Sequence, residues 1–353
     1  MGRALRLGTR GSQLALWQAN AVKARIAETG GPLCHIVVIK TSGDRLQQAP
    51  LSEIGGKRLF VKEIEDALLG AEIDLAVHSS KDMPAVLPDG LTIAAVLPRE
   101  DPHDAVVLPE RESSPRARGE HARPSHTAVN DIEELVAALG QSPSIGTGSI
   151  RRIAQLTRIL PGARFTPIRG NLDTRLRKLD EGERGSLGNM DALVLAAAGL
   201  KRLGFGNRIS LLVPAAACVP APGQGIVAIE TRGGDEDVRR AVAPIDDPRA
   251  AAALAAERSL VEALGGGCQT PIGALATAVG DDLELIAAVV ALDGSQAVRE
   301  RGRGPGSAAR RLGAEVAERL LARGAKEILD EAARQSSHQS PVDGLKSATM
   351  TDD

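Results

Sequence analysis

Short apolar runs alternate with amphipathic stretches along the first two-thirds of the chain. Between the runs, apolar positions recur with the spacing of a helix face. This alternation is typical of parallel α/β sheets covered by helices. The predicted strands are Arg6–Thr9, His35–Lys40, Ile73–His78, Leu91–Leu97, Ile145–Thr147, Ala192–Ala196 and Gly225–Glu230. The predicted helices are Ser12–Ala27, Val61–Leu69, Ile132–Leu139, Ser149–Leu160 and Thr174–Leu179.

The final third of the chain has a different pattern. A long Ala-rich helix is followed by two strands and two helices, which predicts a smaller α+β domain. These elements are Ala250–Leu264, Leu283–Leu292, Ala297–Gly302, Ala308–Leu321 and Ala325–Ala333. Three segments lack apolar periodicity: Leu108–Ala128 and Gly182–Asn189 read as insertions, and the polar tail from Gln335 is expected to be disordered.

The amino-acid composition excludes several classes of protein. A chain of 353 residues is too long for one core and suits two or three domains. The net charge of -2, with no Tyr and only one Trp, argues against a nucleic-acid binder, which needs a basic surface and stacking aromatics. Three scattered cysteines suit neither a disulfide scaffold nor a zinc site, so no metal is expected. No stretch suits export or a membrane span, and a soluble cytoplasmic protein is expected.

Arginine recurs beside small polar or glycine turns that precede helices. Helix N-termini present unpaired N–H donors, and arginine adds a planar fork that matches carboxylates. Each turn alone could be a capped helix with solvated arginines, or a phosphate cradle in the case of Gly-Thr-Gly-Ser. Together they favour a site for a polyanion. The segments are Thr9–Ser12 with Arg10, Gly146–Arg152 with Arg151, Arg169–Asn171 followed by Arg175, and Lys201-Arg202.

A second candidate is the segment His78–Pro84, which follows an apolar strand. It therefore lies at a strand's carboxyl end, where open α/β sheets place their sites. Pro84 keeps Met83 extended, so Asp82 sits on a turn beside Lys81. An exposed Lys–Asp ion pair of little energetic value is the alternative interpretation.

Two glycine-rich segments could be mobile or accessible. Gly55–Phe60, which includes Lys57, suggests a lid over the site, although an ordinary turn with Phe60 in the core would look the same. Gly265–Gly267 precede Cys268, and a triglycine loop is a poor place to bury a thiol. Cys268 is therefore a candidate nucleophile or attachment point, whereas Cys34 and Cys218 read as small buried apolar residues.

Nine strings in conserved order, from Arg6 to about Leu329, resemble the porphobilinogen deaminase family. They are TRGSQLALWQ, GGKRLFVKEIE, DLAVHSSKDMP, REDPHDA, GTGSIRR, RGNLDTRL, LAAAGLKRLG, APGQGIVAIE and GGGCQTPIG. The resemblance implies two lobes like those of periplasmic solute-binding proteins, with a cleft between them, and a smaller α+β C-terminal domain. The resemblance implies that the first lobe consists of residues 1–103 together with 222–245, and the second lobe of residues 104–221. The C-terminal domain is then 246–334, and residues 335–353 form a disordered tail.

The resemblance also implies the chemistry. Four porphobilinogen units are joined, each with loss of ammonia, on one covalent dipyrromethane per chain that is attached to Cys268, and water then releases the linear tetrapyrrole. Asp82 matches the catalytic carboxylate. The residues implied to hold the dipyrromethane are Lys81, Asp82, Thr147, Ser149, Arg151, Arg152 and Gly170. Those implied to bind substrate or the growing chain are Arg10, Ser12, Lys57, Phe60, Arg169, Arg175 and Arg202.

Two positions depart from the family pattern. Ser80 stands where the family often has Met, and Gly148 replaces a common Ser, which removes one hydroxyl donor. Neither removes a group that the mechanism requires. The resemblance implies a monomer that acts on porphobilinogen, with no nucleic-acid or membrane partner. A two-lobed solute-binding protein for an anion is the alternative, and it leaves the exposed Cys268 unexplained.

Overall fold

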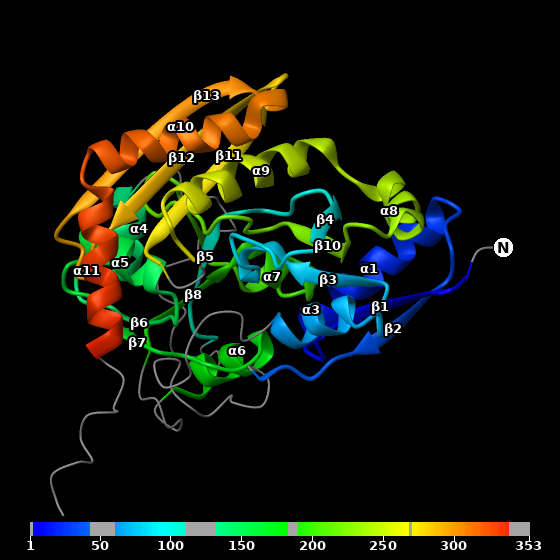
Figure 1. Cartoon of the computed structure of the whole chain (residues 1–353). Coiled ribbons are helices and arrows are strands. Elements are labelled where there is room, and N and C mark those ends of the chain that lie inside the picture. The colour runs from blue at the N-terminus through cyan, green and yellow to red at the C-terminus, as the bar shows by residue number, and fades with distance from the viewer. Residues whose placement is uncertain (1–2, 43–60, 111–131, 183–189, 268–269, 339–353) are drawn as a thin grey trace, which may run out of the picture.

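The computed structural model describes residues 3–42, 61–110, 132–182, 190–267 and 270–338 (Figure 1). Several predicted features lie outside these residues: the proposed lid with Lys57 and Phe60, the attachment residue Cys268, and most of both insertions. The described chain forms three sheets with their covering helices.

The first lobe is a five-stranded sheet in the order β2-β1-β3-β10-β4. Helices α1 and α8 cover one face, and α3 covers the other. Alternating apolar residues of β1, such as Leu5 and Leu7, pack under α1 because successive strand residues point to opposite faces. The strands are β1 (Leu5–Thr9), β2 (Cys34–Val38), β3 (Leu75–Ser79), β4 (Leu91–Val96) and β10 (Val227–Arg232), and the helices are α1 (Gln13–Glu28), α3 (Lys62–Leu69) and α8 (Glu236–Val242).

The second lobe repeats this topology, with strand order β7-β6-β8-β5-β9. Helices α4 and α5 pack against one face, and α6 and α7 against the other. Its strands are β5 (Asp104–Val107), β6 (Ser144–Gly146), β7 (Arg164–Thr166), β8 (Ala192–Ala196) and β9 (Leu211–Val213). Its helices are α4 (Ile132–Leu139), α5 (Ile150–Ile159), α6 (Leu172–Glu181) and α7 (Ala197–Arg202).

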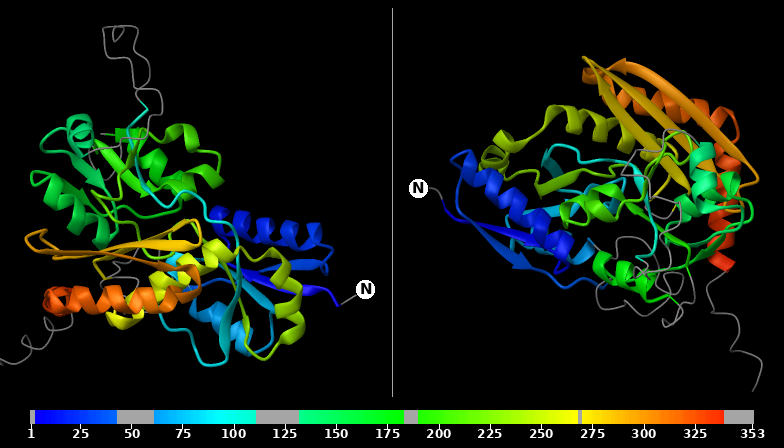
Figure 2. Two further views of the ribbon diagram at one scale, coloured as in Figure 1. Left: turned by 90° about the horizontal axis from the view of Figure 1, so that it is seen from above. Right: turned by 180° about the vertical axis from the view of Figure 1, so that it is seen from behind.

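The C-terminal domain is an antiparallel three-stranded sheet that lies along both lobes (Figure 2). Helices α9 and α10 cover one face, where Ala274 and Leu285 are buried. The other face packs against α5 through Leu275 and Val290. Its elements are α9 (Pro248–Ala263), β11 (Ile272–Val279), β12 (Asp282–Val290), β13 (Ala297–Pro305), α10 (Ala309–Ala322) and α11 (Ala325–His338). Two α/β lobes and a smaller α+β domain confirm the predicted fold class.

Two antiparallel segments join the lobes, residues 97–103 on the way out and 214–226 on the way back. The amide of Leu97 donates to the carbonyl of Val227 at 3.0 Å, and that of Glu100 donates to the carbonyl of Gly225 at 3.0 Å. Gly225 has φ +88°, and a Cβ there would collide with the carbonyl oxygen of Glu100. Only glycine allows this close crossing.

The structure corrects three details of the sequence prediction. The sheets of the lobes are mixed rather than parallel, because β10 runs antiparallel to β3 and β4, and β5 runs antiparallel to β8 and β9. Helix α11 continues to His338, so the predicted disordered tail does not begin at Gln335. Strands β5, β7, β9 and β11 and helix α8 were not predicted. Within the described part of the chain, no helix is long and apolar enough to cross a membrane.

Candidate active site

Asp82 lies directly beyond the carboxyl end of β3. It closes a single 3-10 turn, Ser80–Asp82, and the next residue, Met83, is extended and buried before Pro84. The backbone of Met83, with φ -80° and ψ 149°, is the conformation that a following proline imposes. Lys81 and Asp82 are both half-buried. The predicted position of Asp82 at a strand end is therefore confirmed, on a turn that the proline fixes.

A small cavity of about 50 Å³ lies beside Asp82. Ser12 lines it and caps α1 as predicted, because its Oγ accepts a hydrogen bond from the amide of Ala15 at 3.3 Å. Gln18 is 2% exposed, and its Nε2 has no hydrogen-bond partner among the residues that the structure describes. An unpaired buried donor that lines a cavity is available to a ligand. The polar lining consists of Arg10, Ser12, Gln18, His78, Ser79 and Asp82.

Arg151 and Arg152 occupy the first turn of α5, and both side chains are buried against one carboxylate, Asp104. Arg151 Nη1 lies 2.8 Å from Asp104 Oδ2, and Arg152 Nη2 lies 2.8 Å from Oδ1. Both arginines also donate to backbone carbonyls, those of Val219 and Val194. Arg151 Nε has no partner among the described residues. The pair is thus held rigidly, with most of its donors already used.

The charge of Asp104 is stabilised by these arginines. Burial raises the pKa of the carboxyl, but Arg151 and Arg152 outweigh burial and hold the pKa well below its usual range. Gln224, in the segment that returns from the second lobe, donates to Asp104 Oδ1 at 2.9 Å. The same side chain accepts a longer hydrogen bond, 3.4 Å, from Lys81 Nζ. Gln224 therefore links the Lys81–Asp82 turn of the first lobe to the arginine pair of the second.

Lys81 has an unusual environment for an ammonium group. Burial lowers the pKa of its side chain to about 8, and the positive charges of Arg151 and Arg152 contribute to the decrease. Asp82 and Asp104 act in the opposite direction. Loss of the proton from Lys81 relieves its repulsion by Arg151 and Arg152. A bound anion would offset that repulsion and would therefore favour the charged form of Lys81.

Gly170 and Arg175 are adjacent at the start of α6. Gly170 has φ +108°, and a Cβ there would press on Thr174 at 2.9 Å. The turn directs the Gly170 carbonyl toward Arg175, whose Nε donates to it at 2.8 Å. Burial lowers the pKa of Arg175, Arg152 lowers it further, and Asp82 raises it. Arg175 in the second lobe therefore lies close enough to Asp82 in the first for their charges to interact.

Arg202, at the end of α7, is placed between the two lobes. Its guanidinium lies 5.5 Å from the ring centroid of Trp17 on α1, a cation–π distance. Its Nη2 donates to the carbonyl of Gly225 at 2.8 Å. The structure thus places Arg202 in a contact between α1, α7 and the returning segment.

The remaining predicted residues follow strand ends of the second lobe. Thr147 comes after β6 and is buried, and its Oγ1 accepts from the amide of Ser149 at 3.3 Å. Ser149 is the N-cap residue of α5. Arg169 is half-buried before α6, and its carbonyl accepts from Lys178 at 3.2 Å. All of these positions lie at the carboxyl ends of strands, where the topology predicts a site.

The two described cysteines are buried and unpaired, as predicted. Burial raises the pKa of the Cys218 thiol to about 12 and also raises the pKa of Cys34. Both thiols are therefore poor nucleophiles. Cys268 lies outside the described residues, between Gly267 and Thr270, and these neighbours are joined by a hydrogen bond from Thr270 Oγ1 to the Gly267 carbonyl at 2.6 Å.

Sequence reasoning missed three polar residues of this site, Asp104, Gln224 and Gln18. All three lie within strings that resemble the family, but none stood out by its chemistry. A charge argument could have found Asp104, since two arginines on the inner face of a helix need a buried carboxylate. The site brings the cations Lys81, Arg151, Arg152 and Arg175 near the carboxylates of Asp82 and Asp104, and Arg10 lines the cavity beside Asp82. Among these described side chains the cations outnumber the carboxylates, which suits a ligand that carries several carboxylates.

Comparison with known proteins identifies the family. Residues 5–240 match the family model described as "Porphobilinogen deaminase, dipyromethane cofactor binding domain", and residues 251–322 match "Porphobilinogen deaminase, C-terminal domain". The porphobilinogen deaminase of Pelobacter propionicus is 44% identical over 331 residues, which is 93% of this chain and 97% of that protein. That of Geobacter metallireducens is 43% identical over 93% of this chain and 94% of its own length.

Among solved structures, an ancestral cationic amino acid solute-binding protein has a TM-score of 0.38 at 13% identity. It covers 69% of this chain and 87% of its own, and a likeness of this degree says nothing about ligand or activity. The family models match both α/β lobes and the C-terminal domain, and the relatives match the chain almost end to end. This chain therefore belongs to the porphobilinogen deaminase family.

Proposed function

We propose that this protein is a hydroxymethylbilane synthase. It joins four porphobilinogen units head to tail, each with loss of ammonia, on a dipyrromethane held by a thioether to Cys268, and water releases the linear tetrapyrrole. The observation that carries the proposal is the cationic site around the Asp82 turn. Its excess positive charge fits a substrate that adds two carboxylates with every unit.

The residues present fit a dipyrromethane with several carboxylates. Lys81 and Arg175 are half-buried cations, and the buried Arg151 retains one unpaired N–H. When bound, the dipyrromethane supplies the carbon to which the first substrate unit is joined. We assign its carboxylates to Lys81, Thr147, Ser149, Arg151, Arg152 and Gly170. Because Asp104 already uses most donors of the arginine pair, these two residues act mainly through their charge.

Substrate carboxylates are assigned to the rim of the same site. Arg10 and Ser12 line the cavity beside Asp82, and Arg175 of the other lobe is close enough to Asp82 for their charges to interact. The full set is Arg10, Ser12, Lys57, Phe60, Arg169, Arg175 and Arg202. Planar guanidinium groups hold carboxylates through two parallel hydrogen bonds, so they can orient an incoming pyrrole as well as attract it.

Asp82 is assigned the proton transfers. Asp104 is committed to two arginines, whereas Asp82 lines the cavity in which Ser12 and Gln18 offer hydrogen bonds. A carboxylate there can stabilise positive charge that develops on the substrate when ammonia leaves. It can also accept a proton from the pyrrole carbon under attack and deliver it in the next step.

The remaining assignments are part of the same proposal. We propose domain bounds of 1–103 with 222–245, 104–221, and 246–334, because each of the three sheets falls within one of these ranges. We also propose one dipyrromethane per chain and a cytoplasmic monomer whose small-molecule partner is porphobilinogen.

Intact mass of the purified protein tests the proposal. We expect a mass above that of the sequence by two linked pyrrole units, with the adduct on the Cys268 peptide. Cys268→Ala should abolish the adduct and turnover, whereas Cys34→Ala, at a buried thiol far from the site residues in sequence, should keep both. Full activity with an unmodified Cys268 would contradict the proposal.

A further inference from the structure

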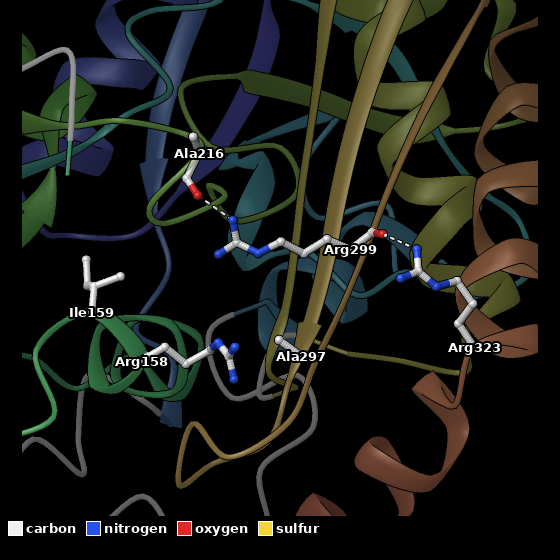
Figure 3. Close-up of a pocket in the computed structure, with 6 residues that line it drawn as sticks. All are labelled: Arg158, Ile159, Ala216, Ala297, Arg299 and Arg323. Carbon is white, nitrogen blue, oxygen red and sulfur yellow. Dashed lines mark hydrogen bonds between the residues drawn. The ribbon is translucent and has the colours of Figure 1, made fainter.

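A second group of arginines lies where the second lobe meets the C-terminal domain (Figure 3). They line a pocket of about 360 Å³ together with Ile159, Ala216 and Ala297. Arg158 lies in the last turn of α5, Arg299 on β13, and Arg323 at the end of α10. None of the six lining residues is acidic.

Two of these three guanidinium groups reach across the domain boundary to backbone carbonyls. Arg158 of the second lobe donates to the carbonyl of Gly294 at 2.7 Å and to that of Ser295 at 3.3 Å. Arg299 of the C-terminal domain donates in the other direction, to the carbonyls of Ala216 and Ala217. The two contacts together fasten the lobe to the C-terminal domain.

Carbonyl partners satisfy hydrogen-bond donors but leave the positive charge uncompensated. Arg323 differs, because its Nη1 lies 2.5 Å from Glu300 Oε1. No acidic side chain in the described ranges forms an ion pair with Arg158 or Arg299. Burial lowers the pKa of Arg299, and Arg158 and Arg301 lower it further. Since guanidinium groups stay protonated, the pocket holds two positive charges that repel each other.

We propose that this pocket binds a small anion with two or more carboxylate or phosphate groups, which joins Arg158 and Arg299 across the domain boundary. The guanidinium forks match the oxygens of either group. An anion between them would replace repulsion with attraction and strengthen the contact of the second lobe with the C-terminal domain. A monovalent anion would neutralise only one of the two charges.

Pyrophosphate and citrate serve as probes, with chloride at matched ionic strength as the monovalent control. Calorimetric titration should show binding of either probe, which raises the melting temperature by mass action. Since the active site is also cationic, variants must separate the two sites. Arg158→Gln or Arg299→Gln should raise the Kd about ten-fold or more. Arg175→Gln should leave this binding event in place.

Arg303→Gln is the matched control, because Arg303 lies on β13 but pairs with Asp282 at 2.9 Å. It should leave the Kd unchanged. Both Arg158→Gln and Arg299→Gln remove hydrogen bonds across the domain boundary as well, so circular dichroism of each variant without the probe checks that it stays folded. Equal affinity in wild type, Arg158→Gln and Arg299→Gln, loss of binding only in Arg175→Gln, or no binding at all would overturn the proposal.

Discussion

Arg152 donates two hydrogen bonds, from Nε at 3.0 Å and from Nη2 at 2.8 Å, to a single oxygen of the buried Asp104 carboxylate. Asp104 is the first residue of β5, the strand through which the chain enters the second lobe. Arg151 donates to the other oxygen at 2.8 Å and to the same oxygen at 3.1 Å, and Gln224 reaches this carboxylate from the returning segment. One side chain thus ties together α5, both connections between the lobes and the region of Lys81.

Asp104→Asn should strongly destabilise the protein, because it leaves two buried guanidinium groups without a counter-ion. Removal of one partner from a buried ion pair costs about 3–5 kcal/mol. The free energy of unfolding in urea should fall by that amount. Because the pKa of Asp104 is lowered on folding, wild type has this stabilisation above pH about 3.9 and loses it as the pH falls below that value.

Asp237→Asn is the control for this variant. Asp237 pairs with Arg240 at 3.1 Å on the surface, where such pairs contribute about 0–1 kcal/mol. Asp104→Asn could instead lower the free energy of unfolding only as little as the control does, or leave the loss of stability at low pH unchanged. Either result would show that the arginine pair does not depend on Asp104.

Lys81 should titrate near pH 8 in protein that lacks the dipyrromethane, such as Cys268→Ala. The ¹³C signal of reductively methylated Lys81, assigned with Lys81→Met, should shift with a midpoint of about 8. The unfolded chain binds a proton at Lys81 up to about pH 10.4, so this group should make stability rise with pH between the two values. Anion affinity of the site should fall through pH 8. A midpoint close to the unfolded value would contradict the burial of Lys81.

The sequence predicted the long apolar strands and the helix starts well, because each carries its own local signal. Ser12 illustrates this, since a polar cap at a strand end is visible without tertiary structure. The missed strands β7 and β9 have three residues each, too few for a period to show. The antiparallel direction of β5 and β10 could not be predicted, because it arises when the chain crosses twice between lobes.

In the candidate site too, the sequence predicted residues that have a local signal and missed contacts that depend on tertiary packing. The strand-end position predicted Asp82, whereas the turns before helices predicted Arg175 and the arginine pair, and these only as members of a cationic set. Burial of Arg151 and Arg152 against Asp104 joins parts of the chain 47 residues apart, and no local pattern encodes it. The partners of Arg202, Trp17 and the carbonyl of Gly225, are likewise set by the packing of the two lobes.

Arg151→Leu and Arg175→Leu should fail at different stages. Arg151→Leu removes charge next to the dipyrromethane, so the purified protein should be largely unmodified in intact mass. Arg175→Leu should keep the dipyrromethane but bind substrate poorly, because a lost charged hydrogen bond costs about 1.5–3 kcal/mol. Arg177→Leu, on the same helix but exposed and 3.7 Å from Glu181, should behave as wild type. If both site variants kept normal modification and turnover, the assigned arginine roles would be wrong.

Asp82→Asn should abolish turnover while the protein stays folded and modified. The substitution keeps the size of the side chain and its capacity for hydrogen bonds, but it removes the charge and the basicity. Loss of general acid–base catalysis alone lowers rates by about 10²–10⁴-fold. Lost stabilisation of the developing cation should add to this. Folding should survive, since Asp82 is half-buried and faces a cavity rather than the core.

Ammonia release in a single turnover is the decisive measurement for Asp82, made on modified protein so that assembly defects do not interfere. Asp82→Glu restores a carboxylate that is displaced by one methylene, so it should release ammonia slowly and accumulate partly extended chains on Cys268, visible by intact mass. Asp89→Asn, at an exposed turn residue on the same loop, should release ammonia normally. Near-normal release from Asp82→Asn would reduce Asp82 to a structural partner of Lys81 and leave the proton transfers to another group that lines the cavity, such as His78.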